Sequence, residues 1–94
     1  MSEQTLKPVP MLPDEIIRIK EAAFRAGVCA RTIRRWNQAH AIGRQSGAGA
    51  PLQISAIALE MVMEGDTAAL ERLRENDRTD PRVRRYIDRI GVPL

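Results

Sequence analysis

Apolar residues recur every three or four positions along most of the chain, which predicts a mainly α-helical domain. The first two helices are expected at residues 20–26 and 30–39. Gly27 lies between them, where a glycine in the left-handed conformation ends many helices. At 100° per residue, the second helix should bury a single stripe. That stripe consists of Ile33, Trp36 and Asn37.

The opposite side of this second helix is strongly basic. On the same helical wheel Arg31, Arg34, Arg35 and Gln38 fall within an arc of about 100°. The three arginines belong to the stretch RAGVCARTIRRW, residues 25–36, which has four arginines and no acid, and Gln38 lies two residues after it. Either these arginines are ordinary solvated charges, or they are directed together at a negatively charged partner.

A β-hairpin and an apolar helix are expected next. Residues 42–45 and 52–54 form the two short strands, and the intervening SGAGAP contains glycines that permit a tight turn. Ser55 is a good N-cap for a helix over residues 56–64. This helix is apolar nearly all the way round, so we expect it at the centre of the core.

Two further helices complete the predicted domain. Asp66 should cap one that ends near Asn76, and Asp80 followed by Pro81 is a strong start signal for another that runs to about Ile90. The apolar stripe of this last helix must be buried, either on its own domain or against a second copy of the chain. The stripe consists of Val83, Tyr86, Ile87 and Ile90.

The N-terminal segment differs in composition from the rest. Residues 1–13 contain three prolines, which favour an extended backbone and predict an arm, although a disordered tail has the same composition. We therefore divide the chain into this arm, a central domain at residues 14–65 and a C-terminal helical extension at residues 66–94 that could support oligomerisation.

Charge is unevenly distributed along the sequence. The formal net charge is +3, yet residues 18–55 hold seven Lys and Arg against one acid, whereas residues 56–80 hold seven acids against three arginines. A concentration of positive charge in one segment is typical of a protein that binds a polyanion.

Several classes of function find no support in the residues. The single histidine and the single cysteine, eleven residues apart, offer no plausible set of metal ligands, and no nucleophile, base and acid occur at motif spacing. We expect no enzyme activity, no cofactor and no small-molecule substrate. The aromatic residues that stack on unpaired RNA bases are scarce. No apolar run is long enough to cross a membrane and no secretory signal is recognisable, so a cytoplasmic location is expected.

The order of the predicted elements is similar to a known DNA-binding fold. The spacing of Ala23, Gly27, Val28, Ile33 and Trp36 resembles the helix-turn-helix pattern, and IKEAAFRAGVCARTIRRW resembles the start of MerR-type regulators and of excisionases, also called recombination directionality factors. The resemblance implies a winged helix-turn-helix in which the hairpin is the wing. Two short helices follow, in place of the long coiled coil of MerR regulators, which favours an excisionase.

This resemblance implies binding to double-stranded DNA. An excisionase binds tandem sites cooperatively and directs an integrase, a site-specific recombinase, toward excision of a mobile genetic element. A MerR-like transcriptional regulator and the DNA-binding small subunit of a phage packaging motor are the alternatives. The SGAGAP tip lacks the basic residue of a typical wing. The residues that the resemblance assigns to DNA are Lys20, Arg25, Arg31, Thr32, Arg34, Arg35, Gln38, Arg44 and Gln45.

Overall fold

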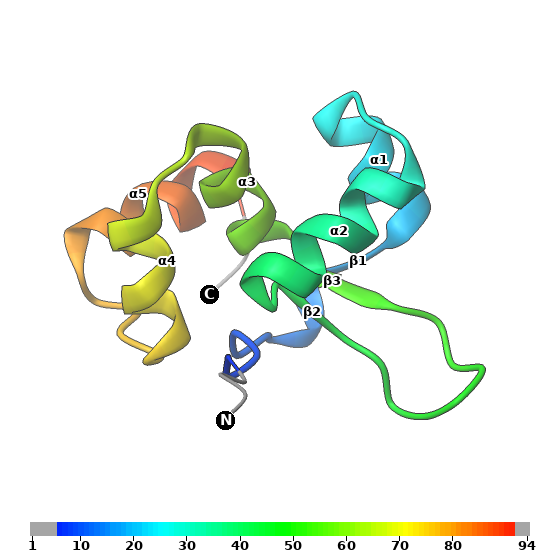
Figure 1. Cartoon of the computed structure of the whole chain (residues 1–94). Coiled ribbons are helices and arrows are strands. Elements are labelled where there is room, and N and C mark those ends of the chain that lie inside the picture. Colours follow the sequence, from blue (N-terminus) through cyan, green and yellow to red (C-terminus); the bar gives the residue numbers. More distant parts are fainter. Residues whose placement is uncertain (1–5, 92–94) are drawn as a thin grey trace, which may run out of the picture.

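The computed structural model describes residues 6–91 and is mostly helical, with a small antiparallel sheet (Figure 1). The predicted helices are all present, and the hairpin lies where it was expected. The sequence did not predict β1 or the 3-10 helix before it. In chain order the elements are a 3-10 helix (Pro13–Glu15), β1 (Ile16–Arg18), α1 (Ile19–Ala26), α2 (Ala30–His40), β2 (Gly43–Arg44), β3 (Gln53–Ser55), α3 (Ala56–Glu64), α4 (Thr67–Arg74) and α5 (Pro81–Ile90).

Local signals in the sequence explain where most of the helices begin and end. Gly27, Gly65 and Gly91 all adopt the left-handed conformation, with φ of 69°, directly after α1, α3 and α5. Side-chain oxygens of the predicted N-caps accept hydrogen bonds from the main-chain N–H groups of the first helical turn, which would otherwise lack partners. These caps are Ser55 for α3, Asp66 for α4 and Asp80 for α5.

The three strands form one sheet in the order β1-β3-β2, antiparallel throughout. Ile17 and Gly43 both pair with Ile54, and this row faces the core. Because side chains alternate between the faces of a strand, the next row faces outward. It consists of Arg18, Gln53 and Arg44.

Helix α3 lies at the centre of the core, as its apolar sequence predicted. Ile57, Ala58, Leu59 and Met61 have no exposed surface. Helices α4 and α5 pack on α3 on one side, and α1 and β3 contact it on the other (Figure 1). A single core therefore joins the N-terminal helices to the C-terminal ones.

The apolar stripe of α5 is buried within this same domain. Val83, Tyr86 and Ile87 are at most 2% exposed and belong to the common core. The Tyr86 hydroxyl donates to Oδ2 of Asp66 at 2.8 Å. Ile90, the fourth residue of the stripe, is half-buried against the same core. Of the two arrangements considered for this stripe, packing on its own domain is the one that the structure has.

The described part of the N-terminal arm lies against the domain. Val9 is buried, and its N–H donates to the carbonyl oxygen of Ala41. Arg74, itself 6% exposed, donates to the carbonyl oxygens of Lys7 at 2.6 Å and of His40 at 2.9 Å. Residues 6–12 are thus a docked extended segment and not a disordered tail. Residues 1–5 lie outside the described part of the chain.

A buried ion pair joins this segment to the C-terminal half. Glu15 is 1% exposed, and both of its carboxylate oxygens accept hydrogen bonds from the Arg78 guanidinium. Glu15 also accepts from the N–H of Leu12, and Arg78 also donates to the carbonyl of Pro10. All of these bonds cross between parts of the chain that are more than sixty residues apart, except the one to Leu12.

No helix in residues 6–91 has the length and apolarity that crossing a bilayer requires.

Loss of the Glu15 charge should destabilise the fold. Glu15→Gln keeps the shape of the side chain but leaves Arg78 without its counter-charge, and we expect the free energy of unfolding to fall by about 3 kcal/mol. Glu75→Gln is the matched control, because Glu75 pairs with Lys7 across 3.8 Å and both side chains are exposed. Equal losses for the two variants in urea denaturation would contradict a structural role for the buried pair.

Asp66 should make stability depend on pH in the acid range. Its pKa is lowered because the Ala69 N–H and then the Tyr86 hydroxyl donate to it. Its contribution is therefore present above the unfolded-state pKa of about 3.9 and is lost as the pH falls through the lower folded-state pKa. Asp66→Asn retains a capping oxygen but does not titrate. Between about pH 6 and pH 2, the free energy of unfolding should fall less steeply in this variant; parallel curves would refute the assignment.

Candidate nucleic-acid interface

The outward face of α2 carries the residues that the helical wheel predicted. Arg31, Arg34, Arg35 and Gln38 are all exposed, while Ile33, on the other side of the helix, has no exposed surface. The wheel therefore predicted the basic face correctly. The inward stripe differs in detail, because Trp36 and Asn37 are half-buried at the edge of the core.

Most basic residues of the C-terminal segment, unlike most of those in residues 18–44, form ion pairs within the chain; in the described residues Arg72 and Arg85 are the exceptions. Arg78, Arg84 and Arg89 each form an ion pair with a carboxylate of the same chain, as do Arg74 and Arg82. In the described part of the chain, no carboxylate forms an ion pair with most of the basic residues of the earlier segment. Those without such a partner are Arg18, Lys20, Arg31, Arg34, Arg35 and Arg44.

Two of the predicted DNA-binding residues already interact within α1 and α2. The Arg25 guanidinium donates to Glu21 at 2.6 Å and 3.0 Å, so its charge is compensated on its own helix. The Thr32 hydroxyl lies 3.5 Å from Sγ of Cys29, and this hydrogen bond is the main cause of a lowered pKa of the exposed Cys29 thiol. Because of these contacts, both residues are less available to a partner than the arginines of the α2 face.

The two predicted hairpin residues lie at the base of the hairpin. Arg44 ends β2 and its Nε donates to Oε1 of Gln53 at 3.1 Å. Gln45 follows, and its side-chain amide donates to the carbonyl oxygen of Ala50. The loop that joins β2 to β3 extends away from the helices (Figure 1), and its exposed tip, residues 46–49, has no basic side chain.

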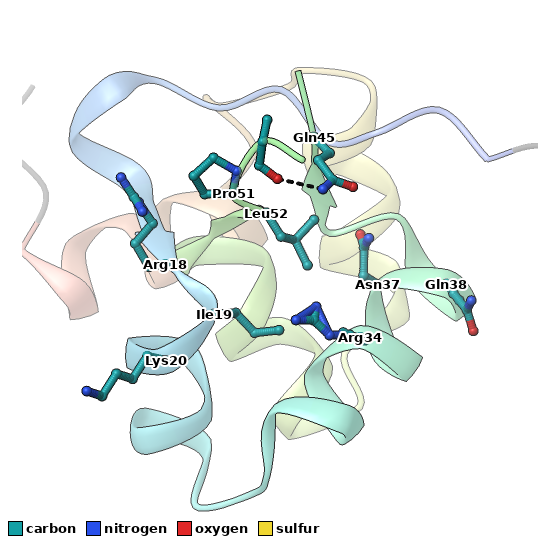
Figure 2. Close-up of a pocket in the computed structure, with 10 residues that line it drawn as sticks. Arg18, Ile19, Lys20, Arg34, Asn37, Gln38, Gln45, Pro51 and Leu52 are labelled. Carbon is teal, nitrogen blue, oxygen red and sulfur yellow. Dashed lines mark hydrogen bonds between the residues drawn. The ribbon is translucent and has the colours of Figure 1, made fainter. Parts of the chain in front are cut away.

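An open groove of about 600 Å³ separates α2 from the hairpin and from the start of α1. Figure 2 shows Arg34 inside this groove, Gln38 on the α2 side, and Lys20 on the side of α1. Gln45 lies at the hairpin edge. The structure thus brings four predicted DNA-binding residues to one groove. It adds Arg18, which the sequence analysis missed.

The Arg18 position had only a weak signal in the sequence. It lies in IIRI, residues 16–19, where an apolar and a charged residue alternate over too few positions to reveal a strand. Only the pairing of β1 with β3 places Arg18 beside the hairpin, opposite Gln53. A prediction that considers each helix or strand by itself does not show which distant strand β1 pairs with.

Asn37 fixes the hairpin to α2. Its Oδ1 accepts a 2.7 Å hydrogen bond from the N–H of Gly43, at the start of β2. Gly43 is buried, and a Cβ atom there would lie 2.7 Å from both the Gln53 carbonyl oxygen and Cδ1 of Ile54. Glycine is therefore required by close packing at this position. The helical wheel placed Asn37 in the inward stripe, but helical periodicity gives no sign of this contact with Gly43.

The C-terminus of α2 is held by a different contact. Its last carbonyl, that of His40, accepts from the buried guanidinium of Arg74 on α4. A cation at this end of a helix is favourable, because the terminal carbonyl groups carry a partial negative charge. The basic helix is thus anchored at its C-terminal end by the C-terminal half of the protein.

The lining of the groove is basic, amide-bearing and apolar. Within residues 6–91, no three His, Cys, Asp or Glu side chains come together to hold a metal ion. The lining of the groove includes no acid, histidine or serine. Its chemistry is that of guanidinium, ammonium and carboxamide groups over apolar side chains, which suits recognition of a negatively charged surface.

Comparisons with protein-family models, with curated protein sequences and with solved structures give no match. The function must therefore be inferred from the geometry and charge of this surface.

Asn37→Ala should weaken the fold locally. The N–H of Gly43 would lose its acceptor in a buried position, and an unsatisfied buried donor costs about 1 to 3 kcal/mol. Gln38→Ala is the matched control, because the neighbouring Gln38 side chain is exposed. We expect a clear fall in melting temperature for Asn37→Ala only. A wild-type melting temperature for that variant would show that the hydrogen bond does not hold the hairpin.

Proposed function

We propose that this protein is a sequence-specific DNA-binding protein with a winged helix-turn-helix. In this proposal α1, the turn at Gly27 and α2 are the helix-turn-helix, and the hairpin of β2 and β3 is the wing. The observation that carries the proposal is the exposed face of α2, where Arg31, Arg34 and Arg35 have no carboxylate partner in residues 6–91.

The chemistry of this face suits the major groove of DNA. Arginine donates two parallel hydrogen bonds to O6 and N7 of guanine, and glutamine pairs in a similar way with adenine. Each good contact of this kind contributes about 1 to 3 kcal/mol of discrimination between bases. Arg34, Arg35 and Gln38 are the proposed base readers, because they lie together on the exposed side of α2.

The remaining cations supply affinity that does not depend on sequence. Lys20 on α1 lines the groove beside α2, and Arg44 is exposed at the end of β2. Neutralising DNA phosphates releases bound counterions, which makes such binding favourable and sensitive to salt. Arg25 contributes less in this proposal, since Glu21 already compensates its charge.

The hairpin contributes through its base and not through its tip. Arg44 and Gln45 lie next to β2, whereas the exposed residues 46–49 are Ser, Gly and Ala. Small neutral residues do not attract a phosphate and do not read a base. We therefore propose contacts along the DNA backbone without deep insertion of the tip into the minor groove.

We further propose that the protein acts as an excisionase. One small reading domain contacts too few base pairs for genomic specificity, and several copies on tandem sites overcome this limit. Such an array beside an attachment site would direct an integrase toward excision of a mobile element. A transcriptional regulator would use the same surface, so an excision assay and a promoter-reporter assay with one set of variants separate the two roles.

Arg34→Ala and Arg35→Ala should each relax sequence preference. We expect the ratio of affinities for a selected duplex and a scrambled duplex to fall roughly five- to 150-fold, the equivalent of one lost base contact. Arg72→Ala is the matched control, because Arg72 is exposed on α4 and lies outside the groove. Circular dichroism confirms folding. Unchanged ratios in both α2 variants, measured by fluorescence anisotropy, would refute the assignment.

A further inference from the structure

The groove between α2 and the hairpin is basic on two sides and contains no negative charge. Arg18 and Lys20 line it from the β1–α1 junction, and Arg34 lines it from α2. None of these cations forms an ion pair in residues 6–91. Three positive charges around one concave surface create a potential that attracts a phosphate group more strongly than any of them alone.

Carboxamide groups add hydrogen-bond donors to the same surface. Asn37 uses its Oδ1 to accept from Gly43, which orients its NH₂ group as a donor. Gln38 adds a second exposed amide on the α2 side. Figure 2 shows Arg34 between the rim that carries Arg18 and Lys20 and the α2 side that carries Gln38. Guanidinium and amide donors around one groove match the acceptor oxygens of a phosphodiester.

The apolar part of the groove lining offers no aromatic surface on which unpaired bases could stack. It consists of Ile19, Ala50, Pro51 and Leu52, and no aromatic residue lines the groove. Proteins that hold single strands stack bases on aromatic side chains. The groove therefore suits the sugar-phosphate chain of a duplex better than an unstacked strand.

From these observations we propose that the groove holds the backbone of one DNA strand, and that Arg18 is a phosphate-binding residue. This inference rests on the proposed function. With α2 in the major groove and the hairpin beside the adjacent minor groove, the strand between the two grooves of DNA runs between these elements. Arg18 is held there because β1 pairs with β3, opposite Gln53.

The test is the salt dependence of duplex binding, measured by fluorescence anisotropy over a series of NaCl concentrations. Arg18→Ala should reduce the magnitude of the slope of log K against log[salt] by about 0.9, the value for one lost phosphate contact in B-DNA. Affinity should fall by the same factor for selected and scrambled duplexes. Arg72→Ala, which removes another exposed arginine that lies outside the groove, should keep the wild-type slope.

Folding and contact position need their own controls. Arg18→Gln retains part of the side-chain stem and replaces Arg18→Ala if circular dichroism shows that the alanine variant is unfolded. Duplexes with single neutral methylphosphonate linkages locate the contact. One linkage should weaken binding by wild type but not by the Arg18 variant, and if no linkage behaves in this way the inference is overturned.

The outcomes separate this inference from the proposed function. If Arg18→Ala keeps the wild-type slope while Arg34→Ala loses sequence preference, the groove does not hold the backbone and the DNA-binding proposal stands. If wild type shows no preference among duplexes, the proposed function itself fails. The groove volume also falls in the range of small-ligand sites. Saturable binding of a nucleoside monophosphate that depends on Arg18 would overturn the backbone assignment in favour of a free nucleotide.

Discussion

Burial of α3 is the constraint on which the rest of the structure depends. This helix is apolar on nearly every side, so other elements must surround it. Helices α4 and α5 cover one side, while α1 and β3 contact another. The single core that results keeps the helix pair of α1 and α2 in a definite position relative to the C-terminal helices. A rigid support of this kind is what a recognition surface needs.

The arginines of the protein serve two physical roles. Most of those in the C-terminal half, such as Arg78 and Arg89, form ion pairs with carboxylates of the same chain, and Arg74 also donates to main-chain carbonyl groups. These contacts stabilise the fold and leave little charge for a partner. The arginines on the outward face of α2 have no such partners in the described residues, so their charge remains available. This contrast, more than the net charge, supports the DNA-binding proposal.

Two contacts link the fold to the proposed interface. The Asn37 side chain holds the first residue of β2, so the hairpin and α2 have a fixed separation. Arg74 bonds the last carbonyl of α2 and also holds the N-terminal segment. Both contacts fix elements that border the basic groove, and neither adds a carboxylate to its lining. Elements distant in the sequence therefore determine how α2 is presented.

The sequence by itself determined the helices, the hairpin and the basic face of α2. Helices are ended by glycines, begun by N-caps such as Ser55 and Asp66, and recognised by their apolar periodicity. Each of these signals depends on residues only a few positions apart, so it can be read from the sequence. Tertiary structure alone decided the pairing of β1, the docking of the N-terminal segment and the position of Arg18 in the groove. These depend on contacts between distant segments, such as Glu15 with Arg78, and no local pattern encodes which distant partner a residue will meet.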